Sequence, residues 1–170
     1  PTGITHLGLC GGSLVPVPAV VTNVLQCGTD IVEDYETEGQ SDSWENGSDY
    51  SDMLFSTFLG RLGREHNVVS KIFDIPAEAD SIDLTFEIYD IDGSTDNSDK
   101  ILVGIQGSLL DLNLFESDGS KKFYNDIEVM GVLKANRQIS FKDDTDRIYS
   151  VSIHIPKNWY QDHGFKLPIS

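Results

Sequence analysis

The residues between Asp90 and Asp99 are the part of the sequence best suited to bind a metal ion. Asp90, Asp92, Asp96 and Asp99 place four carboxylates within ten residues. Ca²⁺ takes about six to eight oxygen ligands from carboxylates, carbonyl groups and water, and short Asp side chains on a turning backbone can converge on one ion. The sequence therefore predicts bound Ca²⁺ here, with a solvated turn rich in Asp and Ser as the alternative.

The segment does not follow the EF-hand pattern, in which one continuous loop supplies nearly all of the ligands. Asp90 and Asp92 fit the first and third ligand positions, but Gly93 stands at the fourth position instead of the sixth. Ile101 occupies the position of the bidentate Glu. Further ligands must then come from elsewhere in the chain, and the candidates are first Glu33 and Asp34, then Asp30, Asp143, Asp144 and Asp146.

Three aromatic residues, Trp44, Tyr50 and Trp159, are candidates for stacking against a sugar ring. The alternative is that Trp44 covers an edge of the core and that Trp159 packs under the last strand. The four histidines show no metal-ligand spacing, and Gly-x-Ser-x-Gly is absent. The many Asp and Glu residues can hide a glycosidase pair, but no local pattern singles one out. We therefore expect no enzymatic activity.

Two cysteines, Cys10 and Cys27, lie close together in a segment rich in Gly and Pro. No His or further Cys accompanies them as a zinc site requires, so we expect a disulfide bond worth about 3 kcal/mol, with two free thiols as the alternative. A disulfide predicts an extracellular or cell-surface location. Asn46-Gly47-Ser48 is a glycosylation sequon, but Asn-Gly also favours a tight turn, which we weigh above the glycan.

The chain is strongly acidic, with 28 Asp and Glu against 12 Lys and Arg and a formal net charge of −16. This charge argues against partners with an anionic surface, namely nucleic acids and anionic membranes. It favours cations, because a divalent ion relieves the repulsion between crowded carboxylates. The alternative is a surface charge that only keeps the protein in solution. No apolar run approaches the roughly 20 residues of a transmembrane helix, so we expect no membrane insertion.

The elements that must position these side chains are predicted to be β-strands. Apolar and polar residues alternate over 82–89 and again over 147–155, the period of a half-buried strand. Further strands are expected at 31–36, 55–62, 68–75, 101–106, 109–115 and 127–132. A length of 170 residues suits one domain. We predict an all-β, antiparallel, jelly-roll-like sandwich over residues 30–170, preceded by an irregular segment, 1–29, that the disulfide closes.

Three short motifs with aromatic and acidic residues follow one another along the chain. They are Phe58-Leu-Gly-Arg-Leu-Gly63, Lys71-Ile-Phe-Asp-Ile-Pro76 and Phe86-Glu-Ile-Tyr-Asp-Ile-Asp92. Together they resemble a domain of large bacterial and algal surface proteins, often found beside hemolysin-type calcium-binding repeats. The resemblance implies a secreted β-sandwich of the adhesion or carbohydrate-binding type, with Asp90 and Asp92 opening the acidic loop. Asp90 stands where the family pattern leads us to expect Glu.

These features favour a non-catalytic, calcium-binding extracellular module for adhesion or carbohydrate binding. The alternative is a structural subunit that assembles with copies of itself into a sheet or filament. Residues 165–170 suggest it, because they resemble a strand just beginning, and a sheet lacking its last strand can take one from another copy, such as residues 18–25. A carboxylate-dependent glycoside hydrolase is the third hypothesis.

Overall fold

The computed structural model describes residues 5–8, 31–33, 40–52, 55–59, 68–90, 101–112, 119, 121–137 and 146–170. For residues 5–8, 31–33, 40, 49–52, 55–58, 90, 135–137 and 146 it describes the backbone alone. Most of these residues lie in strands of two antiparallel sheets, so the predicted all-β sandwich is confirmed. No helix within the described ranges has the length and apolar character needed to cross a membrane.

The larger sheet has six strands. They are β1 (Thr5–Gly8), β2 (Ile31–Glu33), β6 (Ser81–Asp90), β9 (Lys121–Tyr124), β10 (Ile127–Arg137) and β11 (Asp146–Pro156). Their order is β2-β1-β6-β11-β10-β9, and all neighbours are antiparallel. Residues 5–8 fall in the segment predicted to be irregular, yet they form a strand between β2 and β6. The strands that pair with residues 5–8 are far away in sequence, so the local sequence does not predict this strand.

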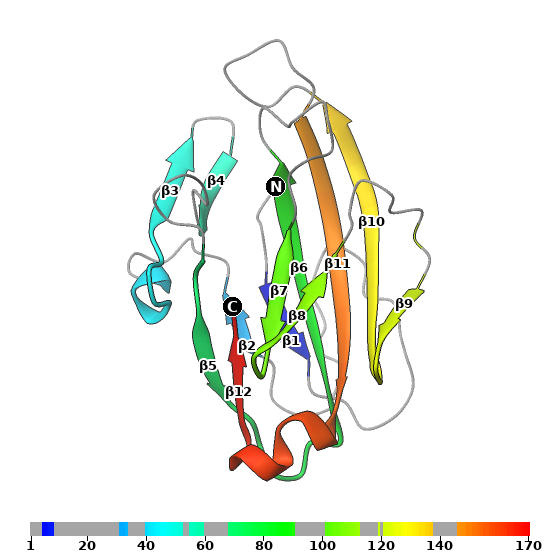
Figure 1. Ribbon diagram of the computed structural model, residues 1–170. Coiled ribbons are helices and arrows are strands. Elements are labelled where there is room, and N and C mark those ends of the chain that lie inside the picture. Colours follow the sequence, from blue (N-terminus) through cyan, green and yellow to red (C-terminus); the bar gives the residue numbers. More distant parts are fainter. Residues whose placement is uncertain are drawn as a thin grey trace.

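The smaller sheet has four strands. They are β5 (Lys71–Asp74), β7 (Leu102–Ile105), β8 (Ser108–Asp111) and β12 (Lys166–Ile169). Their order is β5-β12-β7-β8. The C-terminal residues are therefore not the start of a strand at an open edge, because β12 lies between two neighbours, β5 and β7. Figure 1 shows β7 and β8 in front of β6 and β11, as two layers.

Smaller elements flank the sandwich. A two-stranded ribbon consists of β3 (Asp49–Asp52) and β4 (Phe55–Leu59), and its register shifts between Ser51 and Asp52. Three short 3-10 helices are described: η1 (Gln40–Ser43), η3 (Lys157–Trp159) and η4 (Gln161–His163). The helices η3 and η4 connect β11 to β12 at the lower end of the view in Figure 1.

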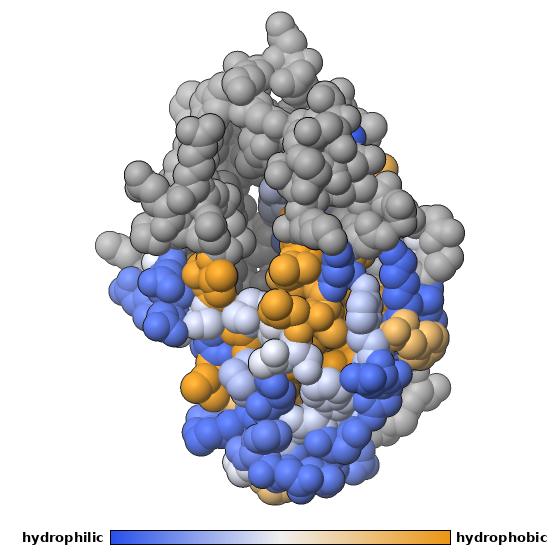
Figure 2. Space-filling view, viewed as in Figure 1, coloured by the Kyte–Doolittle hydropathy of each residue, from blue (hydrophilic) through white to orange (hydrophobic). Residues whose placement is uncertain are grey.

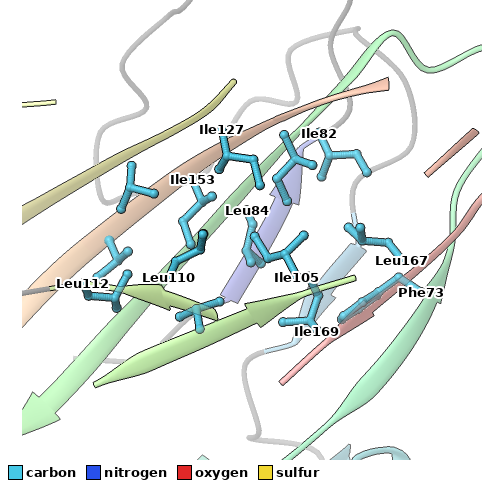
Figure 3. Close-up of a cluster of buried hydrophobic side chains, with 14 of the residues drawn as sticks. Phe73, Ile82, Leu84, Ile105, Leu110, Leu112, Ile127, Ile153, Leu167 and Ile169 are labelled. Carbon is cyan, nitrogen blue, oxygen red and sulfur yellow. The ribbon is translucent and has the colours of Figure 1, made fainter. Parts of the chain in front are cut away.

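The core lies between the two sheets, as Figure 3 shows. The predicted alternation of β6 and β11 is confirmed, because Ile82 and Ile153 are fully buried whereas Asp83 and His154 lie on the outer face. Full burial of such an aliphatic side chain stabilises the fold by about 1.5–3 kcal/mol. From the smaller sheet, Phe73, Val103, Ile105, Leu110, Leu167 and Ile169 complete the core.

Two tight turns use backbone conformations that only certain residues adopt readily. Gln106 and Gly107 join β7 to β8 with φ of 49° and 77°, the positive values that a two-residue hairpin of this kind requires at both positions. Asn46 has φ of 59°, and the Gly47 N–H donates to the Trp44 carbonyl. A Cβ on Gly47 would lie 2.5 Å from the Ser41 carbonyl oxygen. The tight turn predicted for Asn46-Gly47 is thus confirmed.

Candidate functional site

The strand pairing brings two acidic positions to one end of the larger sheet. Asp90 ends β6 and lies opposite Arg147, and Asp146 begins β11 opposite Arg137. The strand β2 runs parallel to β6, because both are antiparallel to β1, which lies between them. Glu33, the last residue of β2, pairs with Thr5, which the register places level with Phe86, four residues before the end of β6. Glu33 thus lies short of the end formed by Asp90 and Asp146, which we call the acidic end.

The described residues cover only part of the predicted calcium site. Asp92, Asp96, Asp99 and Asp34 lie outside them, and so do Asp30, Asp143 and Asp144. For Asp90, Asp146 and Glu33 the backbone alone is described. Within the described part of the chain, no group of three or more His, Cys, Asp or Glu side chains is arranged to hold a metal ion. The acidic end is therefore defined by the pairing of the strands and not by side-chain contacts.

Arg147 adds a positive charge to the acidic end that sequence reasoning missed. No Lys or Arg occurs between Lys71 and Lys100, so the local sequence shows nothing to neutralise Asp90. The strand pairing places Arg147 directly opposite Asp90, although the two residues are far apart in sequence. An arginine on the next strand thus occupies the position that pairs with Asp90.

Trp44 lies in the core rather than on an open surface. Its side chain is only 9% exposed, and its ring meets that of Phe73 edge-on, with centroids 6.0 Å apart. The Lys71 ammonium lies 5.8 Å from the Trp44 ring centroid and donates to the Ser43 hydroxyl at 2.7 Å. No broad ring face remains for a sugar, so the structure places Trp44 as the core residue of our alternative interpretation.

Trp159 is half-buried against the core and is held by the turn between β9 and β10. Its indole N–H and the side-chain amide of Asn158 both donate to the Asp126 carboxylate, the amide at 2.6 Å. These two hydrogen bonds, that from Trp159 first, lower the pKa of Asp126 below its ordinary value of 3.8. The arrangement fastens η3 to the hairpin. Of the other predicted residues, Tyr50 lies in β3 with only its backbone described, and Cys10 and Cys27 lie outside the described residues.

The Asp126 hydrogen bonds lead to a prediction about pH. In the Trp159→Phe variant the indole donor is absent, so the pKa of Asp126 should rise toward 3.8, as measured by NMR titration of its carboxyl carbon. Because folding lowers this pKa, the ionised carboxylate stabilises the fold at pH values above 3.8, and that contribution is lost as the pH falls through the folded-state pKa. Asn158→Ala should raise the pKa less. An unchanged pKa in Trp159→Phe would contradict this assignment.

The outer face of the larger sheet carries a row of four side chains that sequence reasoning did not bring together. Cross-strand pairing aligns Phe123, Glu128, His154 and Asp83 on β9, β10, β11 and β6. His154 Nδ1 lies 2.7 Å from the Asp83 carboxylate, and the Lys121 ammonium lies 2.6 Å from that of Glu128. The alternation in β11 predicts that His154 faces outward, but nothing local indicates Phe123 as its neighbour.

The outer face of the smaller sheet carries exposed aliphatic side chains beside the Lys166–Asp74 ion pair. Leu102 and Leu109 are 46% and 66% exposed on β7 and β8, and Ile72 is 62% exposed on β5. Figure 2 shows apolar side chains gathered over β7 and β8. Exposed aliphatic side chains thus gather on β5, β7 and β8, whereas the described outer face of the larger sheet carries the row of paired polar side chains.

No protein-family model, curated protein sequence or solved structure matches the chain. The resemblance to domains of surface proteins therefore depends on the three motifs alone. Phe58 of the first motif lies in β4, the second motif contains β5, and the third covers the end of β6. The motifs thus belong to three separate strands, and the third leads into the acidic end.

Proposed function

We propose that the chain is a calcium-binding β-sandwich module of an extracellular or cell-surface protein, which acts in adhesion or carbohydrate binding without catalysis. The acidic end is the observation that supports calcium binding. The chain leaves β6 at Asp90 and enters β11 at Asp146, and these strand ends are neighbours. A calcium site that one loop cannot complete needs ligands from a second segment. The neighbouring ends of β6 and β11 support the proposal, because segments that leave or enter them begin close together.

Charge supports the same proposal. Asp90, Asp92, Asp96 and Asp99 carry four negative charges, to which Asp146 adds a fifth at the end of the sheet where Asp90 lies. Arg137 and Arg147 balance only part of this charge. A divalent cation with oxygen ligands would offset the remaining repulsion. The ion would then fix the connection after β6 to the sheet, a structural role that leaves the outer faces for binding.

A thermal melt with Ca²⁺ and with a chelator tests the calcium site. Free Ca²⁺ at 100 times its dissociation constant should stabilise the wild type by about 2.7 kcal/mol. The Asp90→Ala/Asp92→Ala variant should lose this response. Its matched control is Glu78→Ala/Asp162→Ala, which removes two exposed carboxylates elsewhere and should keep the response.

Two outcomes would count against the calcium site. If Ca²⁺ does not change the melting temperature of the wild type, the protein has no such site. If the wild type responds and Asp90→Ala/Asp92→Ala responds equally, the ion binds elsewhere.

A further inference from the structure

We propose that the outer face of the larger sheet binds a neutral, extended oligosaccharide along the row of Phe123, Glu128, His154 and Asp83. We call this row the outer row. The inference rests on the carbohydrate-binding part of the proposed function and supplies the surface that performs it. It does not depend on bound calcium.

The strand register sets the geometry of the outer row. Phe123 lies opposite Glu128, Glu128 opposite His154, and His154 opposite Asp83. Directly opposed residues point to the same face, and neighbouring strands are about 4.8 Å apart, so the row extends over about 14 Å. That is the length of a short oligosaccharide lying across the strands. Figure 1 shows β9, β10, β11 and β6 as neighbours in one layer.

Phe123 supplies the apolar contact. Its side chain is 65% exposed, and it is the one exposed aromatic residue among the side chains that the structure describes. A pyranose ring has an apolar face of C–H groups, which loses contact with water when it stacks on an aromatic ring. The structure thus moves the expected sugar contact from Trp44, which is in the core, to Phe123 at the edge of the sheet.

The polar members of the outer row are held in place before any ligand arrives. His154 Nδ1 lies 2.7 Å from an Asp83 carboxylate oxygen, and Lys121 Nζ lies 2.6 Å from a Glu128 carboxylate oxygen. Side chains that are already ordered lose less conformational entropy on binding. Carboxylate oxygens accept hydrogen bonds from sugar hydroxyls, while ammonium and imidazole N–H groups donate to them. One sugar can therefore use both types of partner along the row.

The local charge selects a neutral ligand. Asp83, Glu128 and Glu87 are the carboxylates that β6 and β10 present here, and each has a basic partner, His154, Lys121 and Lys134 respectively. Two of these three carboxylates are thus offset by a lysine, so little of the chain's formal net charge of −16 lies on this surface. A sulfated or uronic acid chain would be repelled by that overall charge, whereas a neutral chain would not.

Calorimetric titration with cellohexaose, xylohexaose and mannohexaose tests the proposal, with oligogalacturonate as the anionic comparison. The wild type should bind at least one neutral hexaose and not the anionic one. Phe123→Ala should weaken that binding about tenfold or more, because the ring loses its stacking contact. The control Leu109→Ala removes an equally exposed apolar side chain, 66% exposed, from the other sheet and should bind like the wild type.

Each outcome decides the question. Binding that Phe123→Ala weakens and Leu109→Ala does not supports the outer row. Binding that both variants retain shows that the protein binds sugar elsewhere, so the proposed function survives and this inference does not. Binding that a chelator abolishes in a protein that stays folded assigns the sugar to the calcium site and overturns the outer row. If the wild type binds no neutral hexaose, both this inference and the carbohydrate-binding part of the proposed function are wrong. Calcium binding is then still tested by the thermal melt.

Discussion

Trp44→Ala should lower the free energy of unfolding by about 3–5 kcal/mol, as measured by urea denaturation. Trp44 is buried, its ring packs edge-on against Phe73, and Lys71 lies over both rings. Truncation would leave a cavity in the core and remove these contacts. A loss of this size is a large part of the stability of an ordinary domain.

The control for Trp44 is Phe123→Ala, an aromatic residue on the surface. Because Phe123 is largely exposed, its truncation should change the free energy of unfolding by less than about 0.5 kcal/mol. If Trp44→Ala instead leaves stability unchanged and abolishes sugar binding, Trp44 is the ligand-facing residue of the first interpretation. The pair of variants thus separates a core role from a binding role for the two aromatic residues.

Leu167→Ala should destabilise the protein by about 2–5 kcal/mol. Leu167 is fully buried in β12 and lies opposite Phe73 of β5, and two residues further on Ile169 lies opposite Ile105 of β7. A strand between two neighbours cannot lose its main core contact without weakening the whole smaller sheet. Urea denaturation measures the effect.

Leu109→Ala is the matched control for Leu167, because it makes the same chemical change in the same sheet on an exposed side chain. It should leave the free energy of unfolding within about 0.5 kcal/mol of the wild-type value. Equal effects of the two substitutions would show that β12 is not held inside the sheet. Such a result would return the C-terminal strand to the edge, where strand exchange between copies becomes feasible.

The sequence predicted most of the fold because alternating burial is a local property. Ile82 and Leu84 alternate with polar residues, and so do Val151 and Ile153, and the structure confirms both strands. Strands in which apolar and polar residues alternate only weakly were harder to predict. The hairpin partner β9 has only four residues, and its exposed Phe123 gives no signal of an outer face.

The candidate sites depend on strand order, which the sequence does not reveal locally. Asp83 and His154 are 71 residues apart and lie side by side only because β6 pairs with β11. The same pairing brings Arg147 to Asp90. Trp44 was a candidate for a sugar contact and for an edge of the core, and its packing against Phe73 and Lys71 supports the second interpretation.

The central position of β12 has a consequence for how the chain folds. Lys166 and its partner Asp74 are 92 residues apart, and β5 and β7 lie next to each other only through β12. The smaller sheet therefore cannot close until the residues of β12 have been synthesised. Until then the edges of β5 and β7 that pair with β12 remain open, and pairing over such a separation is slow. Closure of the smaller sheet should thus be a slow step that depends on long-range pairing of β12.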